Sequence, residues 1–160
     1  MGIQYYIVPL GSYGGRSDAL ASSLEAFGIT IAVDQSPSRY PTPREIRAVL
    51  DQLDGYAVTY HVDAYTWWAD VTDAVDPQHA RWTSLIVQDF EGVEDEPHEF
   101  YFAKGWEDLI IQIVEKLSRV CGPLVLIDDI NWMPLLITPE TDVGSALIKW
   151  QALSEAVKKL

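Results

Sequence analysis

Residues Tyr56 to Val62 alternate strictly between larger side chains and smaller or polar ones, and this pattern constrains the fold more than any other in the chain. Because successive side chains of a strand point to opposite faces, the tyrosines and valines share one face and the residues between them share the other. Shorter extended segments follow at residues 67–72, 82–90 and 100–103, and turn-forming residues separate them. Closely spaced strands joined by turns are typical of an antiparallel meander, so we expect one in the middle of the chain.

Helix signals flank this predicted meander. Thr42 is a capping residue, Pro43 suits the first helical position, and Glu45 completes a capping box three residues after the cap. These residues predict a helix that begins at Pro43 and is ended by Gly55. Apolar residues at helical spacing predict three further helices, over residues 20–27, 106–120 and 142–159.

The run Leu124–Ile127 is apolar at every position, which is typical of a strand covered on both faces. Additional strands are predicted over residues 3–8, 29–33 and 134–138. A chain of 160 residues suits one domain, and no internal repeat or linker divides it. We therefore predict a single α+β domain over residues 1–160, with a mixed, largely antiparallel sheet and about four helices packed on it.

Negative charge is concentrated in the middle third of the chain. The net charge is −13, from 24 acids and 11 bases, and residues 51–108 hold fourteen of the acids but only two of the bases, Arg81 and Lys104. The same segment holds eleven of the eighteen aromatic residues. A nucleic-acid ligand is disfavoured, because phosphate backbones are bound by clustered lysine and arginine and this chain has no basic stripe.

Two interpretations of this acidic and aromatic segment, residues 51–108, stay open. In the first, the acids cover solvated faces and limit self-association while the aromatic residues fill the core. In the second, the segment is a binding surface for a cationic partner, where acids steer the encounter and aromatic rings supply the central contacts. The two interpretations differ in whether large rings stay on the surface among carboxylates.

A short block of aromatic and then acidic residues is the most informative local feature. Trp67 and Trp68 are adjacent, so in a strand they point to opposite faces and only one enters a single core easily. The other must be covered by another element, covered by a partner chain, or left exposed. The candidate binding residues are the whole block: Tyr65, Trp67, Trp68, Asp70, Asp73 and Asp76.

Four residues are weaker candidates for catalytic or ligand-binding chemistry. His61 and Asp63 lie two apart at the end of a predicted strand and share a face, which suits an acid–base pair. Asp128 and Asp129 follow the predicted buried strand, at an edge where open α/β sheets bind ligands. Solvent-facing and turn-forming roles also account for these residues, since aspartate side chains bond to their own backbone. Two ligands do not complete a zinc site, so we predict no metal and no cofactor.

The sequence carries no common catalytic signature. It has no G-x-S-x-G elbow, no H-E-x-x-H or C-x-x-C motif and no EF-hand loop, and the turn Gly11–Ser17 departs from a phosphate-binding loop. The single cysteine, Cys121, fits a reducing compartment, and the first residues show no secretory signal. No apolar run approaches the roughly 20 residues of a membrane span. We therefore expect a cytoplasmic protein without a membrane partner.

The hypothesis that follows is a small acidic binding protein that docks a basic protein partner through residues 51–108. Inhibitors and immunity-type proteins that neutralise a cationic target use such charge complementarity. We favour this class over an enzyme. The alternatives are an enzyme or small-ligand-binding domain with carboxylates at a sheet edge, and a structural subunit of a homo-oligomer.

Overall fold

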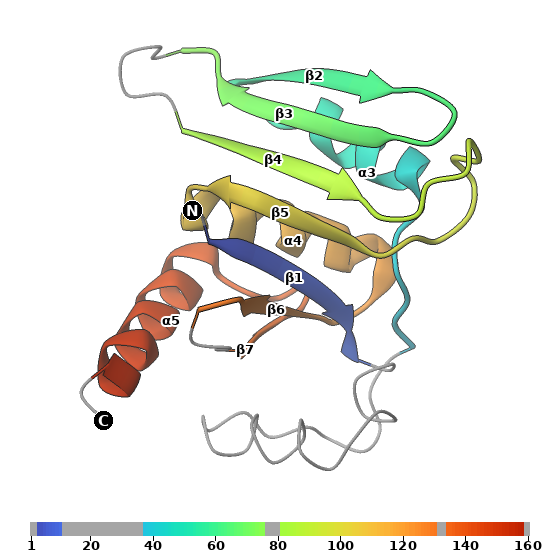
Figure 1. The fold of residues 1–160 in the computed structure, drawn as a ribbon. Coiled ribbons are helices and arrows are strands. Elements are labelled where there is room, and N and C mark those ends of the chain that lie inside the picture. The colour runs from blue at the N-terminus through green and yellow to red at the C-terminus, as the bar shows by residue number, and fades with distance from the viewer. Residues whose placement is uncertain (1–2, 11–36, 76–80, 131–133, 159–160) are drawn as a thin grey trace.

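The computed structural model describes residues 3–10, 37–75, 81–130 and 134–158, and within these ranges seven strands form one sheet in the order β2-β3-β4-β5-β1-β6-β7 (Figure 1). The strands are β1 (Gln4–Pro9), β2 (Tyr56–Val62), β3 (Trp67–Asp73), β4 (Trp82–Val87), β5 (Phe100–Gly105), β6 (Leu124–Asp128) and β7 (Pro134–Ile137). The described helices are α3 (Pro43–Asp51), α4 (Glu107–Cys121) and α5 (Val143–Lys158).

The predicted mixed sheet with about four helices is wrong for the described residues. All six strand pairings there are antiparallel, and three helices are present. Helix α4 connects β5 to β6, which run in the same direction, but β1 lies between them and pairs with both. Each neighbouring pair is therefore antiparallel. The helix predicted over residues 20–27 and the strand predicted over residues 29–33 lie outside the described residues.

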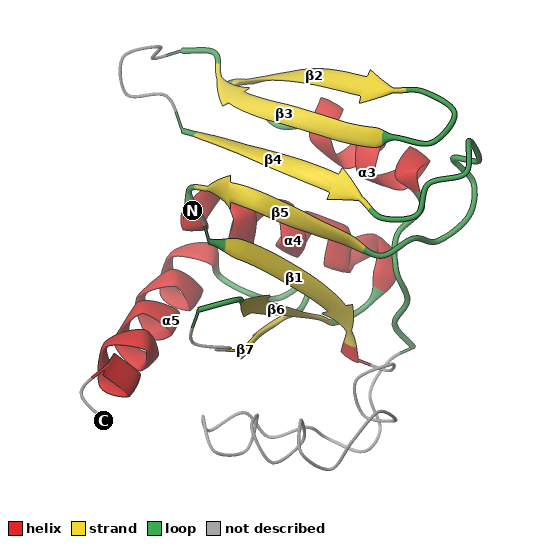
Figure 2. Cartoon of the chain, in the orientation of Figure 1, coloured by secondary structure: helices red, strands yellow, loops and turns green. Residues whose placement is uncertain are grey.

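All three described helices pack on one face of the sheet, with α3 and α4 behind the strands in Figure 2. The core on this face contains inward side chains from every described strand. Ile46 and Leu50 of α3, Ile110 of α4 and Trp150 of α5 complete it. Burial of a large apolar side chain contributes about 1.5–3 kcal/mol, so this shared core gives the helices a fixed place on the sheet.

Strand β6 is buried on both faces, as its apolar run predicts. All five of its residues are buried. Leu124 and Leu126 belong to the core under the helices, whereas Val125 and Ile127 join Leu10 in a second cluster on the opposite face. The end of β6 is therefore held firmly from both sides.

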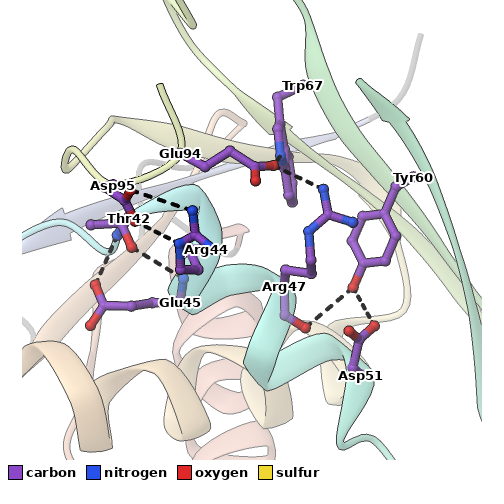
Figure 3. A network of polar contacts seen from close by, with 9 residues as sticks. All are labelled: Thr42, Arg44, Glu45, Arg47, Asp51, Tyr60, Trp67, Glu94 and Asp95. Carbon is purple, nitrogen blue, oxygen red and sulfur yellow. Dashed lines mark hydrogen bonds and ion pairs between the residues drawn. The ribbon is translucent and has the colours of Figure 1, made fainter. Parts of the chain in front are cut away.

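The start of α3 confirms the predicted capping box. The Thr42 hydroxyl accepts a hydrogen bond from the Glu45 backbone N–H at 3.1 Å, and the Glu45 carboxylate accepts one from the Thr42 N–H at 3.0 Å (Figure 3). Arg39 donates two further hydrogen bonds to this carboxylate, at 2.7 and 2.8 Å. Together these bonds lower the pKa of Glu45 to about 2, and the bond from Arg39 is the largest cause.

Glu45 therefore links the stability of the fold to pH. Its pKa is lowered from a usual value of 4.5 to about 2, so its stabilising contribution is present above pH 4.5 and is lost as the pH falls toward 2. Glu45→Gln keeps the capping geometry, because glutamine also serves at this position, but it removes the charge. We expect this variant to lower the free energy of unfolding by about 1 kcal/mol at neutral pH and by less in strong acid. Urea unfolding at both pH values measures this, and an equal loss at both would contradict the role of the charge.

Gly122 ends α4 at a position where a larger residue does not fit. Its φ is 84°, in the left-handed region, and its N–H donates to the Ser118 carbonyl oxygen at 2.9 Å. A Cβ at this residue would overlap the carbonyl oxygen of Pro37 and approach the Cα of Ser38 at 3.1 Å. We expect Gly122→Ala to lower the free energy of unfolding by about 2–4 kcal/mol, because left-handed strain and overpacking act together.

Gly144→Ala is the matched control for this prediction. Gly144 lies in the first turn of α5, and a Cβ built there meets no described atom within 4 Å apart from its own chain neighbours and the backbone of its own helix. We expect this substitution to leave the stability unchanged or to raise it by up to about 1 kcal/mol, because alanine favours helix over glycine. Urea unfolding compares the two variants, and equal midpoints would contradict the close packing at Gly122.

Candidate functional site

One face of strands β2 to β5 carries no described helix, and its outward side chains are defined here as the open face (Figure 2). Burial alternates along these strands, so every second side chain belongs to this face. The open face consists of Ala57, Thr59, His61, Trp68, Asp70, Thr72, Trp82, Ser84, Ile86, Tyr101 and Ala103. The register of the strands places Asp70 between Thr59 and Ser84, near the middle of this surface.

The two adjacent tryptophans point to opposite faces, as predicted. Trp67 is fully buried in the core, where its indole Nε1 donates to Glu94 at 2.9 Å and its ring centroid lies 5.7 Å from that of Tyr60. Trp68 lies on the open face and is 36% exposed. The outward indole is therefore outside the core formed by the described helices.

Side-chain contacts hold Trp68 and Asp70 in fixed positions. The His61 ring stacks on Trp68 with the two ring centroids 4.5 Å apart. His61 Nε2 lies 2.9 Å from one Asp70 carboxylate oxygen, and the Ser84 hydroxyl donates to the other at 2.6 Å. Each carboxylate oxygen of Asp70 is thus bonded to a neighbouring strand, and the aromatic and acidic groups are already oriented for contact.

Two further exposed indoles lie at the other end of these strands. Trp82 begins β4 and is 41% exposed, and Trp106 directly precedes α4 and is 49% exposed. The Trp106 backbone N–H donates to the Trp82 backbone carbonyl oxygen at 3.2 Å, so the two residues are neighbours. The helix predicted over residues 106–120 begins at Glu107, and Trp106 is its cap residue. All three exposed indoles among the described residues come from residues 51–108.

The loop between β4 and β5, residues 88–99, carries six acids and no lysine or arginine. Two of these acids attach the loop to α3: Arg44 bonds to Asp95 at 2.6 Å, and Arg47 bonds to Glu94 at 2.9 Å (Figure 3). The pKa of Glu94 is lowered, with the hydrogen bond from Arg47 as the largest cause. The other four acids of the loop are exposed, so the loop presents them to solvent.

The positive charge of the arginines is neutralised locally in the described part of the chain. Each of its five arginines is paired with a carboxylate: Arg39 with Glu45, Arg44 with Asp95, Arg47 with Glu94, Arg81 with Asp108 and Arg119 with Glu115. Arg81 is one of the two bases of residues 51–108, and Lys104 is the other. Residues 51–108 therefore supply only two cationic side chains of their own against fourteen acidic ones.

The remaining described members of the predicted binding block are not part of the open face. Tyr65 is 83% exposed in the turn between β2 and β3. Asp63 builds that turn: its Oδ1 accepts the backbone N–H groups of Tyr65 and of the next residue at 2.8 and 2.7 Å, and these bonds lower its pKa. Asp73 ends β3 and accepts a backbone N–H two residues later at 2.8 Å. Asp76 lies outside the described residues.

The four candidate catalytic residues do not converge. His61 lies on the edge strand β2 and Asp128 ends β6, and four strands separate these two strands in the sheet. Asp129 closes the ladder between β1 and β6: its Oδ1 accepts the Gln4 N–H at 3.0 Å, and its own N–H donates to the Gln4 carbonyl oxygen at 3.0 Å. Asp63 is held in its turn. Within the described residues, no group of histidine, cysteine and acidic side chains has the geometry to hold a metal ion.

Asp128 instead lines a cavity of about 400 Å³ together with Tyr5, Glu107 and Trp150. These residues come from four different elements, so the sequence does not mark them as neighbours. The only signals available were local ones, namely the place of Glu107 in the first turn of a predicted helix and the place of Asp128 after a buried strand.

Because the two adjacent tryptophans lie on opposite faces, the same substitution is predicted to destabilise the protein at one position and to have little effect at the other. Trp67→Phe removes the indole donor to Glu94 and leaves unfilled core volume, so we expect the free energy of unfolding to fall by about 2–4 kcal/mol. Trp68→Phe keeps a ring beside His61, so we expect a change of less than about 0.5 kcal/mol. Urea unfolding followed by circular dichroism measures both values, and equal losses would contradict the placement of one ring inside and one outside.

The open face combines exposed aromatic rings with a hydrogen-bonded carboxylate. Its exposed rings supply apolar contact area, and Asp70 supplies a fixed negative charge among them. None of the described helices is both long enough and apolar enough to cross a membrane. The chain matches no protein-family model, and comparisons with curated proteins and with solved structures give no match.

Proposed function

We propose that this chain is an acidic binding protein that docks a basic protein partner on the open face. One observation carries the proposal: Trp68 and Trp82 are exposed on the open face on either side of Asp70. They belong to a segment with fourteen acids and two bases. Exposed rings beside fixed carboxylates suit arginine and lysine side chains, which form ion pairs with the carboxylates and pack over the ring faces.

The extent of the open face favours a protein over a small ligand. Trp68 and Thr72 lie four residues apart on β3, a span of about 13 Å, and Trp82 lies opposite Thr72 on β4. Contacts this far apart on an exposed sheet suit an interface of about 800 Å² per partner, whereas small ligands bind in concave pockets. Tryptophan is also among the residues that most often dominate the energy of such interfaces.

The fixed positions of the contact groups favour tight binding. The His61 ring holds Trp68 by stacking, so little side-chain freedom is left for Trp68 to lose when a partner covers it. The Asp70 oxygens already accept bonds from His61 and Ser84, and each carboxylate oxygen retains a second lone pair. An incoming guanidinium or ammonium group therefore meets a carboxylate that is already oriented.

The placement of charge favours a cationic partner over a neutral or acidic one. The acidic loop, residues 88–99, follows β4 at the end of the strands where Trp67 and Val87 pair, which is also the Trp68 end. Its exposed carboxylates attract a basic surface and repel an acidic one. Inhibitors and immunity-type proteins of cationic targets use this physics, and the proposal extends to that class on the ground of charge.

Capture followed by purification of the captured protein tests this proposal. The immobilised chain is exposed to native cell extract at low salt, and each retained protein is purified and measured against the wild type, Trp68→Ala and Asp70→Asn by surface plasmon resonance. We expect a partner of net positive charge whose affinity for Trp68→Ala is at least about 30-fold lower. We also expect its association rate to fall steeply with salt, because exposed charges are screened over about 8 Å at physiological ionic strength.

Ile148→Ala is the control, because Ile148 is 70% exposed on α5 and lies outside the open face. It should bind the partner as the wild type does, and circular dichroism verifies that each variant folds. Equal affinity of the wild type and Trp68→Ala would overturn the proposal, as would the capture of no basic protein. Self-association that Trp68→Ala abolishes, measured by sedimentation, would overturn it as well and would assign the open face to a second copy.

A further inference from the structure

Strand β2 forms one edge of the sheet, and no strand of the described residues lies beyond it. In Figure 1 it is the uppermost strand, and β7 forms the opposite edge. An edge strand presents a row of backbone N–H and C=O groups with which another strand can pair. The edge of β2 is therefore a place where an extended segment of another protein can join the sheet.

The hydrogen bonds between β2 and β3 determine which backbone groups of β2 face outward. The Ala74 N–H donates to the Gly55 carbonyl oxygen at 2.8 Å, and the Asp63 N–H donates to the Thr66 carbonyl oxygen at 2.9 Å. Bonded positions alternate along an antiparallel pair, so the odd-numbered residues between these two bonds also bond to β3. The backbone groups of the even-numbered residues point away from β3, and these residues are Tyr56, Val58, Tyr60 and Val62.

Strand β2 lacks the features that protect many edge strands from association. Such strands are often very short, interrupted by a bulge, or supplied with proline or lysine. All seven residues of β2 pair with β3 in one register, and none of them is proline or lysine. The opposite edge strand, β7, has four residues and begins at Pro134. Of the two edges, β2 is thus the one suited to accept a further strand.

The two faces of the sheet differ in chemistry beside this edge. Val58 and Tyr60 are half-buried and pack against the core under the helices. Thr59 and His61 point to the opposite side, where they are exposed on the open face. The side chains of an added strand also alternate between the two faces. A segment with apolar residues on the helix side and polar or charged residues on the other side therefore fits the edge.

Acidic residues around the edge select the charge of that segment. From Asp51 to Val75 the chain holds five acids and no lysine or arginine. Asp54 lies just before β2 and Asp63 directly after it, and both are exposed. A segment that pairs along the whole of β2 runs between these two carboxylates. Lysine and arginine in the segment are therefore attracted, and acidic residues are repelled.

The same charges disfavour a second copy of this chain at the edge. Two β2 strands that pair antiparallel through all their outward groups place Val58 of each copy opposite Tyr60 of the other. This register brings Asp54 of each copy near Asp63 of the other, at both ends of the pair. Like charges brought together across strands are destabilising. A basic segment of a different protein does not meet this repulsion.

We propose that the outer edge of β2 binds an extended basic segment of a partner protein, which joins the sheet as a further antiparallel strand. Its apolar side chains lie beside Val58 and Tyr60, and its basic side chains lie on the side of the open face. The contacts that hold it are backbone hydrogen bonds at the edge. The proposal therefore does not rest on the docking of a partner through Trp68 and Trp82.

Titration with two blocked heptapeptides, followed by nuclear magnetic resonance of the labelled full chain, tests the proposal. One peptide is acetyl-Lys-Val-Lys-Val-Lys-Val-Lys-amide, and the other has glutamate in place of each lysine. At constant ionic strength, we expect the lysine peptide to shift the backbone N–H resonances of Val58, Tyr60 and Val62 with saturation. The glutamate peptide should bind at least about tenfold more weakly. Absence of a saturable shift at these residues, or equal binding of the two peptides, would overturn the proposal.

Methylated forms of the lysine peptide separate strand pairing from simple attraction of charge. In an antiparallel pair, the peptide residues that bond to β2 share a face with Val58 and Tyr60, so they are the valines. Methylation of the valine amide nitrogens removes these donors, whereas methylation of the lysine amide nitrogens removes donors that point away from β2. We expect the first form to bind at least about tenfold more weakly than the second. Equal affinity of the two forms would contradict pairing with the edge and overturn the proposal.

A proline in the chain itself locates the binding at the edge. Val62→Pro deletes an outward N–H near the end of β2, and proline is tolerated in edge strands where the N–H faces solvent. Val62→Ala is the matched control, because it shortens the same side chain, which is 42% exposed, and keeps the N–H. We expect Val62→Pro to bind the lysine peptide at least about threefold more weakly than Val62→Ala, with circular dichroism verifying that both fold.

Two outcomes of these measurements would overturn the role of the edge. The first is equal affinity of the folded Val62→Pro and Val62→Ala variants for the lysine peptide. The second is a dimer of the wild type, detected by sedimentation, that Val62→Pro abolishes and Val62→Ala retains. That result would assign the edge of β2 to a second copy of this chain.

Discussion

Strand β1 pairs with β5 on one side and with β6 on the other, although both partners occur far later in the chain: Gln4 lies opposite Ala103, and Tyr6 lies opposite Ile127. Bringing such distant segments together costs chain entropy, which only the contacts formed afterwards recover. The insertion of β1 joins the β2–β5 meander to the β6–β7 pair. Strands β5 and β6, which α4 connects, therefore each pair with β1 in the antiparallel sense and do not form a parallel pair with each other. The position of β1 thus decides where the end of β6 meets α4 and α5, and with it the position of the cavity.

Local patterns predicted the elements and their faces because the forces behind them act over a few residues. The alternation from Tyr56 to Val62 predicts which side chains share a face, and the adjacent Trp67 and Trp68 predict that one ring lies outside a single core. The capping box at Thr42 likewise depends on residues three positions apart. These patterns do not show which face of the sheet the helices cover. The position of the helices therefore decides that Trp67 is the buried ring and Trp68 the exposed one.

Local sequence patterns do not predict contacts between segments that are distant in the chain. The sequence marked Trp68 and Asp70 as candidates, but Trp82 joins them on the open face only through the β3–β4 register. His61 and Asp128 are both plausible acid–base residues on local grounds, and the strand order separates them. Glu107 reaches the cavity beside Asp128 because α4 returns across the sheet to β6. Proximity of this kind follows from the order of strands, which no short pattern encodes.

The charge that surrounds the exposed rings also selects what can cover them. Exposed rings on a sheet favour association, and a second copy of this chain would bring the same excess of negative charge to the contact. The described arginines are held in ion pairs with carboxylates, so a second copy would have to break such a pair to offer a guanidinium to Asp70. A basic partner brings its cations without that cost. Repulsion between copies and attraction to a cationic surface therefore act in the same direction, and both favour a complex between unlike proteins on the open face.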